Sequence, residues 1–123
     1  MKLLTLDQFI AEFNEWKSSS LEKEIKSLYK NILEKFTLFE DKDNIEINLI
    51  KIKQQFQNKG YFKEICKKIF EYANKVKKTV TIWPDEVKNG ISPIILKQIY
   101  KGIGFKEHPT KENPDEMIWY YEK

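Results

Sequence analysis

A six-residue segment in the middle of the chain has residue types that can hold a phosphate group. Its sequence is Gln57-Asn58-Lys59-Gly60-Tyr61-Phe62. It lies between the apolar run Ile45 to Ile52 and the helix-patterned stretch Phe62 to Val76, which predicts a strand, a turn and a helix. A turn that opens a helix presents unpaired backbone N–H groups and the positive end of the helix dipole, so it can bind a diphosphate without a lysine or a metal. The alternative is an ordinary turn, in which Gly60 only lets the backbone change direction.

A second phrase follows downstream, after the short apolar run Thr79 to Trp83. It reads Leu96-Lys97-Gln98-Ile99-Tyr100-Lys101-Gly102-Ile103-Gly104-Phe105. In this order and at this separation, the two phrases resemble the GCN5-related N-acetyltransferase (GNAT) superfamily over roughly residues 45–121. In that family a Gln/Arg-x-x-Gly-x-Gly/Ala turn binds the pyrophosphate of acetyl-CoA, and a later helix carries a tyrosine beside the thioester. The sequence departs from the family at Phe62, where Gly or Ala is preferred, and at Ile99, where Phe is common.

The resemblance implies an acetyl-CoA site and a set of catalytic groups. The implied cofactor-binding residues are Ile50, Lys51, Ile52, Gln57, Asn58, Lys59, Gly60, Tyr61 and Phe62. Tyr100 is the implied acid that protonates the departing thiolate, and a backbone N–H near Ile50 to Ile52 would polarise the thioester carbonyl. Glu46 is the candidate base, directly or through a water that Asn48 could order. The alternatives are a tyrosine packed on the sheet and a surface carboxylate.

Composition and charge limit the classes of function. The chain has 123 residues, 41% apolar and 33% charged, which suits one soluble globular domain. The net charge of +3 is too mild and too mixed to imply nucleic acid as a partner. No run approaches the roughly 20 apolar residues of a membrane span, and Asp7 follows a short apolar start, so we expect a cytoplasmic protein. The one cysteine, Cys66, is predicted to be a buried apolar residue, and no cluster has metal-ligand spacing, so no metal is expected.

The first half of the chain predicts two helices followed by a hairpin. The helices are predicted from Leu6 to Trp16 and from Leu21 to Phe36, each with an apolar stripe at helical spacing. Phe36 to Phe39 reads as a short strand before a polar turn. Within Ile45 to Ile52 the apolar alternation slips by one residue, which predicts either a β-bulge or a central strand buried on both faces.

The second half alternates helices and strands. A helix is predicted from Phe62 to Val76, and a second begins at Pro93 and ends near Ile103. The other predicted strands are Thr79 to Trp83, Phe105 to His108 and Met117 to Tyr121. The resemblance therefore implies an α/β (α+β) GNAT-like fold, with a mixed central sheet flanked by helices and two N-terminal helices in place of the usual opening. We expect one domain over 1–123, with a divergent helical acceptor-side region over 1–40 and an acetyl-CoA-binding core over 45–121.

Two classes of function agree with these patterns. The first is an N-acetyltransferase that moves an acetyl group from acetyl-CoA to an amine, either a small molecule or a protein lysine or N-terminus. The second is a non-catalytic GNAT-fold interaction module or inhibitor, of the kind that phages and mobile elements encode. A nucleic-acid-binding module is a third and weaker reading. No membrane partner is expected, and a homodimer is left open.

Overall fold

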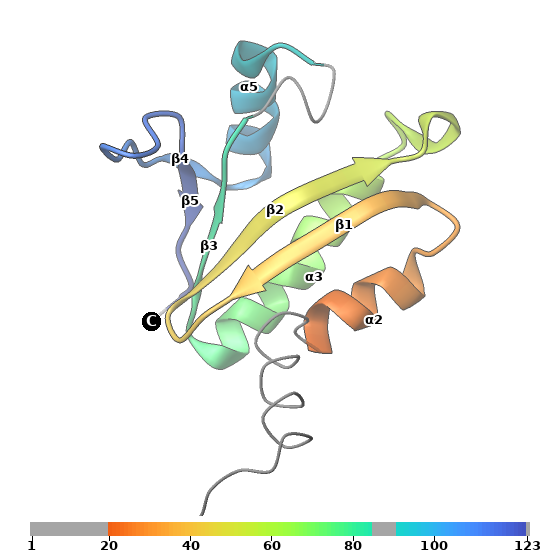
Figure 1. The fold of residues 1–123 in the computed structure, drawn as a ribbon, viewed down its shortest axis with the longest axis horizontal. Helices are drawn as coiled ribbons and strands as arrows, with labels where there is room; N and C mark the ends of the chain where they lie inside the picture. Colours follow the sequence, from red (N-terminus) through yellow and green to blue (C-terminus); the bar gives the residue numbers. More distant parts are fainter. Residues whose placement is uncertain (1–19, 85–90, 123) are drawn as a thin grey trace, which may run out of the picture.

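The computed structural model describes residues 20–84 and 91–122, and the structural statements below concern these residues. The helix predicted from Leu6 to Trp16 lies outside them. The elements in chain order are α2 (Ser20–Leu28), β1 (Leu33–Glu40), β2 (Asn44–Ile52), the 3-10 helix η1 (Gln54–Phe56), α3 (Tyr61–Val76), β3 (Thr79–Ile82), α5 (Pro93–Ile103), β4 (Lys106–Glu107) and β5 (Met117–Trp119). Figure 1 shows their arrangement. Within the described part of the chain, no helix is long and apolar enough to cross a membrane.

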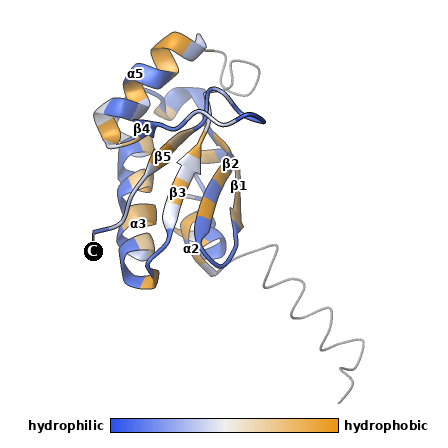
Figure 2. Ribbon diagram, turned by 90° about the vertical axis from the view of Figure 1, so that its left-hand side faces the viewer, coloured by the Kyte–Doolittle hydropathy of each residue, from blue (hydrophilic) through white to orange (hydrophobic). Residues whose placement is uncertain are grey.

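The five strands form one mixed sheet in the order β1-β2-β3-β5-β4. β2 and β3 are parallel, whereas β1 with β2, β3 with β5, and β4 with β5 are antiparallel. Helices α2 and α3 contact each other and pack against the sheet, and α5 lies beyond the end of β3 (Figures 1 and 2). The core between sheet and helices is almost entirely apolar, and Cys66 on α3 is buried within it, as predicted. The predicted fold class, a mixed sheet flanked by helices, is confirmed.

The second predicted helix is wrong beyond Leu28, because β1 occupies the residues from Leu33 onward. The pairing of β1 with β2 is irregular between Leu33 and Lys35, so that Leu33 and Phe36 are both buried although they are three residues apart. A spacing of three on one buried face is the pattern of a helix, and here a strand irregularity produces it. Leu33 to Phe36, the last four residues of the predicted helix, therefore belong to a strand.

A β-bulge interrupts β2 at Asn48, and the predicted slip in the apolar pattern marks it correctly. Thr37 of β1 pairs with Leu49, but Leu38 pairs with Ile47, which leaves Asn48 as an extra residue on β2. The bulge lies in the part of β2 that diverges from its parallel neighbour β3. Among the described residues, β2 and β3 pair only where Asn44 to Glu46 meets Thr79 to Thr81. Beyond Glu46, β2 runs away from β3 and opens the sheet (Figure 1).

Candidate functional site

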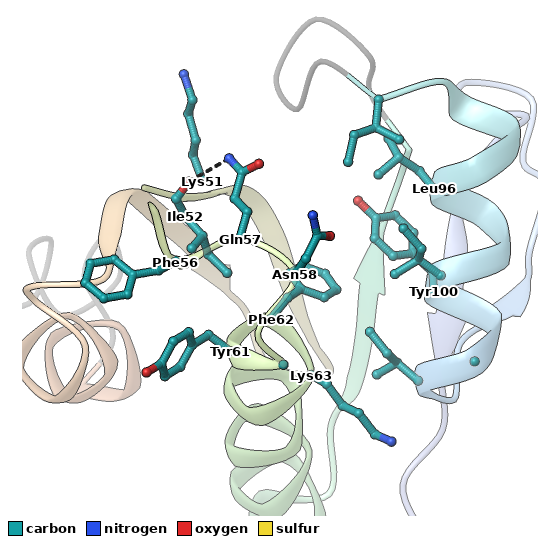
Figure 3. Close-up of a pocket in the computed structure, with 15 residues that line it drawn as sticks. Lys51, Ile52, Phe56, Gln57, Asn58, Tyr61, Phe62, Lys63, Leu96 and Tyr100 are labelled. Atoms are coloured by element: carbon teal, nitrogen blue, oxygen red, sulfur yellow. Dashed lines mark hydrogen bonds between the residues drawn. The ribbon is translucent and has the colours of Figure 1, made fainter. Parts of the chain in front are cut away.

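The turn that follows β2 is held to the end of that strand by Gln57. Its side-chain Nε2 donates a hydrogen bond to the Ile52 carbonyl oxygen at 3.0 Å (Figure 3). Two residues of the turn have positive φ angles, 62° at Asn58 and 87° at Gly60. Asparagine and glycine are the residue types that adopt this conformation at least cost, which explains the local sequence.

Gly60 directly precedes α3 and gives the turn its open surface. A Cβ atom placed on Gly60 would meet no atom within 4 Å, so conformation and not crowding requires the glycine. The first backbone hydrogen bond of α3 runs from the Glu64 N–H to the Gly60 carbonyl oxygen at 3.1 Å. The N–H groups of residues 61–63 therefore have no acceptor within the helix, and together with the helix dipole they suit an anion.

Helix α5 forms the opposite wall and places Tyr100 near the turn. The helix begins with Pro93 as its first residue and ends at Ile103, and the C-cap residue Gly104 has a φ of 132°. Tyr100 is 2% exposed, and its ring stacks on the Phe62 ring with centroids 5.6 Å apart and an interplanar angle of 21°. The hydroxyl of Tyr100 points from α5 toward the side of the cavity where Asn58 lies (Figure 3).

A cavity of about 450 Å³ lies between these two walls. Its lining residues are Lys51, Ile52, Phe56, Gln57, Asn58, Gly60, Tyr61, Phe62, Lys63, Ile91, Leu96, Ile99, Tyr100, Gly102 and Ile103. Most of them are apolar, and none of these described lining residues is acidic. The polar groups are the two turn amides, the tyrosine hydroxyls and two lysines, so the cavity is suited to an elongated ligand with apolar and anionic parts.

Ion pairs on the outer side of α5 fix the helix to the β4–β5 hairpin. Lys97 Nζ lies 2.8 Å from Asp115 Oδ1, and Lys101 Nζ lies 3.5 Å from Glu107 Oε2. The hydrogen bond to Asp115 raises the pKa of the Lys97 ammonium group. Lys97 and Lys101 are one helical turn apart, so both charges lie on one side of α5.

The structure brings most of the predicted site residues together. Lys51, Ile52, Gln57, Asn58, Gly60, Tyr61, Phe62 and Tyr100 all line the cavity. Ile50 is buried in the core, and Lys59 is an exposed turn residue that does not line the cavity. Glu46 and Asn48 do not line it either; Glu46 lies on β2 opposite Phe39 and Thr81. The chemical roles of all these residues stay predictions.

Sequence reasoning missed the apolar wall of the cavity. Phe56 comes from η1, while Ile91, Leu96, Ile99 and Ile103 come from α5 and the residues before it. The signal was present in α5 as apolar residues three and four apart around Tyr100, but the same spacing also describes an ordinary buried helix face. Lys63 of α3, which was not among the predicted site residues, also lines the cavity.

Comparison of the sequence with models of known protein families and with curated proteins gave no match. Comparison of the fold with solved structures gave matches. The crystal structure of the anti-CRISPR protein AcrVA5 superimposes with a TM-score of 0.59 at 15% identity, covering 68% of this chain and 86% of the other. A GNAT family N-acetyltransferase, YhbS from Escherichia coli in complex with CoA, gives a TM-score of 0.48 at 11% identity, covering 90% of this chain and 73% of the other. At such identities the likeness concerns the fold. The chain shares the fold of AcrVA5 over the matched part, and this fold is the mixed sheet flanked by helices that the sequence predicted.

Proposed function

We propose that this protein is an acetyl-CoA-dependent N-acetyltransferase whose acceptor is an amine. The observation that carries the proposal is the divergence of β2 from β3 beyond Glu46, next to a cavity bounded by the Gln57–Gly60 turn and by Tyr100. A strand that leaves its parallel neighbour has an open hydrogen-bonding edge, and an extended molecule that contains amide groups can pair with it.

The described residues fit the cofactor part by part. The backbone N–H groups at the start of α3 match a pyrophosphate, and the edge of β2 from Ile50 to Ile52 matches the amides of a pantetheine arm. Lys63 at the cavity adds a positive charge near the same turn. When bound, acetyl-CoA supplies an activated acetyl thioester. The protein's own groups would bind and orient it and would manage the protons.

Tyr100 and the strand backbone are the proposed catalytic groups. A backbone N–H of Ile50 to Ile52 would stabilise negative charge on the thioester oxygen, and the Tyr100 hydroxyl would give its proton to the leaving sulfur. Tyr100 is largely shielded from water, so water would compete little with the leaving sulfur for the hydroxyl proton. The amine must be uncharged to attack, and Glu46 stays the proposed base for its proton.

The cofactor site is tested by a substitution in the turn. Gly60→Pro should abolish CoA binding, because proline fixes φ near −65° and cannot adopt the 87° that the turn requires. Gly60→Ala keeps the donor and should weaken binding less, and Lys59→Ala removes only an exposed charge worth about 1 kcal/mol or less. Isothermal calorimetry with CoA measures all three, and thermal melts identify any variant that fails to fold. Equal affinity in folded Gly60→Pro and wild type contradicts the proposed site.

A second candidate function is a protein-interaction module or inhibitor of the same fold. It is favoured by the exposed isoleucines of α5, among which Ile94 is 72% and Ile95 is 50% exposed, and by the likeness to a protein described as an anti-CRISPR. Native mass spectrometry and turnover with a panel of amines separate the two. Retained CoA with acetylated product supports the enzyme, whereas no CoA and no turnover supports the module.

A further inference from the structure

We propose that Phe62 is a positioning residue that holds the Tyr100 ring in the orientation needed for proton transfer. This inference rests on the proposed function and adds to it a residue from the opposite wall of the cavity. Phe62 belongs to the first turn of α3, and Tyr100 to α5. Their ring stack therefore connects the phosphate-binding wall to the wall that carries the acid.

The geometry of the pair is that of an aromatic stack. The centroids are 5.6 Å apart and the planes are inclined by only 21°, within the range in which aromatic rings attract each other. Within residues 20–84 and 91–122, the Phe105 ring also lies near Tyr100, with centroids 6.0 Å apart and planes inclined by 60°. Both Phe62 and Tyr100 line the cavity, so the stack forms part of its surface (Figure 3).

The stack matters because α5 has few other anchors. Within the described residues, Leu96 and Tyr100 are the buried residues of this helix. The ion pairs of Lys97 and Lys101 hold the outer side of the helix, whereas the Phe62 ring contacts Tyr100 at the cavity. The hydroxyl is at the far end of the side chain, so a small rotation moves it a long way. A misplacement of about 1 Å can cost about 10²-fold in rate.

The ring contact with Tyr100 depends on the aromatic residue at position 62. A glycine or alanine, which the resembled family prefers here, has no ring and could not make the contact. Phenylalanine still leaves the backbone N–H groups of the turn available, because only its side chain differs. The departure from the family pattern thus coincides with a new contact to the proposed acid.

The test is a double-mutant cycle of Phe62→Ala and Tyr100→Phe, with kcat as the readout. In the wild-type background we expect Phe62→Ala to lower kcat about tenfold or more, while CoA affinity changes less. In the Tyr100→Phe background the same substitution should cost little, because the hydroxyl that Phe62 positions is already absent. An equal loss of kcat in both backgrounds overturns the proposal.

A structural readout decides the question without turnover. Crystal structures of Phe62→Ala and of the matched control Phe56→Ala should differ at Tyr100. Phe56 lines the same cavity but pairs edge to face with Tyr61, so its loss should leave the Tyr100 rotamer unchanged. A single, unchanged Tyr100 rotamer in Phe62→Ala overturns the positioning role. Absence of CoA binding and turnover in the wild type, by contrast, overturns the proposed function itself.

Discussion

Tyr100 is the side chain at which the proposed chemistry is most directly tested. Phenylalanine at this position keeps the ring and its stack on Phe62, so Tyr100→Phe should leave CoA affinity and the melting temperature nearly intact. Loss of a general acid typically costs about 10²–10⁴-fold, and a thiolate is a tolerable leaving group, so kcat should fall by roughly 10²-fold. Steady-state kinetics beside a thermal melt make the measurement. A tyrosine that only packs would lose stability with no separate loss of kcat.

For single residues, the sequence predicted which residues lie at the site, but it did not predict where their side chains point. Gln57 was identified because of its place in the turn, yet its amide nitrogen bonds the Ile52 carbonyl oxygen. The side chain thus fastens the turn to the strand. Phe62 was treated as a departure from the family, and the ring stack that gives it a use depends on α5, which lies some 30 residues further along the chain. Contacts between distant segments leave no local pattern.

Among the elements, the bulged hairpin of β1 and β2 depends on a buried carboxylate of α2. Glu22 is 5% exposed, and its Oε1 accepts a hydrogen bond of 2.7 Å from the Leu38 backbone N–H. Leu38 is the residue of β1 at which the register shifts. A bulge disrupts the regular ladder, and Glu22 supplies an acceptor where it does so.

Removal of that acceptor should destabilise the fold. Glu22→Ala leaves the Leu38 N–H without the carboxylate, and an unsatisfied buried donor costs about 1–3 kcal/mol. Glu24→Ala removes an exposed carboxylate from the same helix and should cost well under half as much. Urea denaturation of both variants gives the free energies of unfolding. Equal values for the two would show that Glu22 does not support the hairpin.

The elements themselves were partly predictable. The slip in β2 was readable because isoleucines occupy both phases of the alternation, and the structure confirms a bulge there. The prediction of a helix up to Phe36 was wrong, because the irregular strand pairing near Leu33 places buried residues at the spacing of a helix. Periodicity records which residues share a buried face, but it does not record whether a helix or an irregular strand places them there.

For the molecule as a whole, two tyrosine–glutamate pairs connect α3 to the rest of the fold. The Tyr29 hydroxyl donates to Glu64 Oε1 at 2.9 Å, and the Tyr72 hydroxyl donates to Glu40 Oε2 at 2.7 Å. Burial, the hydrogen bond and the nearby negative charge, in that order, raise the pKa of each tyrosine to about 12. Both pairs thus require protonated tyrosines.

These pairs predict a loss of stability in alkali. An unfolded tyrosine loses its proton at a pKa of about 10, and the two folded tyrosines lose theirs at a pKa of about 12. Between these values the native state binds more protons, so the free energy of unfolding falls as the pH rises. Below pH of about 10 the contribution is fully present.

At neutral pH, Tyr29→Phe should have a lower free energy of unfolding than the wild type. Between about pH 10 and 12, its free energy of unfolding should fall less than that of the wild type. The control Tyr120→Phe removes the hydroxyl of a side chain that is 53% exposed, and should follow the wild type. Denaturant titrations across this range, with tyrosinate absorbance followed in parallel, give the comparison. A Tyr29→Phe profile parallel to that of the wild type would contradict the assignment.

The bulge at Asn48 can also be viewed as a single inserted residue. Without it, the strand would read Ile45-Glu46-Ile47-Leu49-Ile50-Lys51-Ile52, with every isoleucine in one phase. Such a strand has uninterrupted period-two patterning and could continue its pairing along β3. A deletion of Asn48 is therefore expected to give a more regular sheet with a closed gap. The single residue Asn48 would then be the difference between a better-paired sheet and a sheet with room for a ligand.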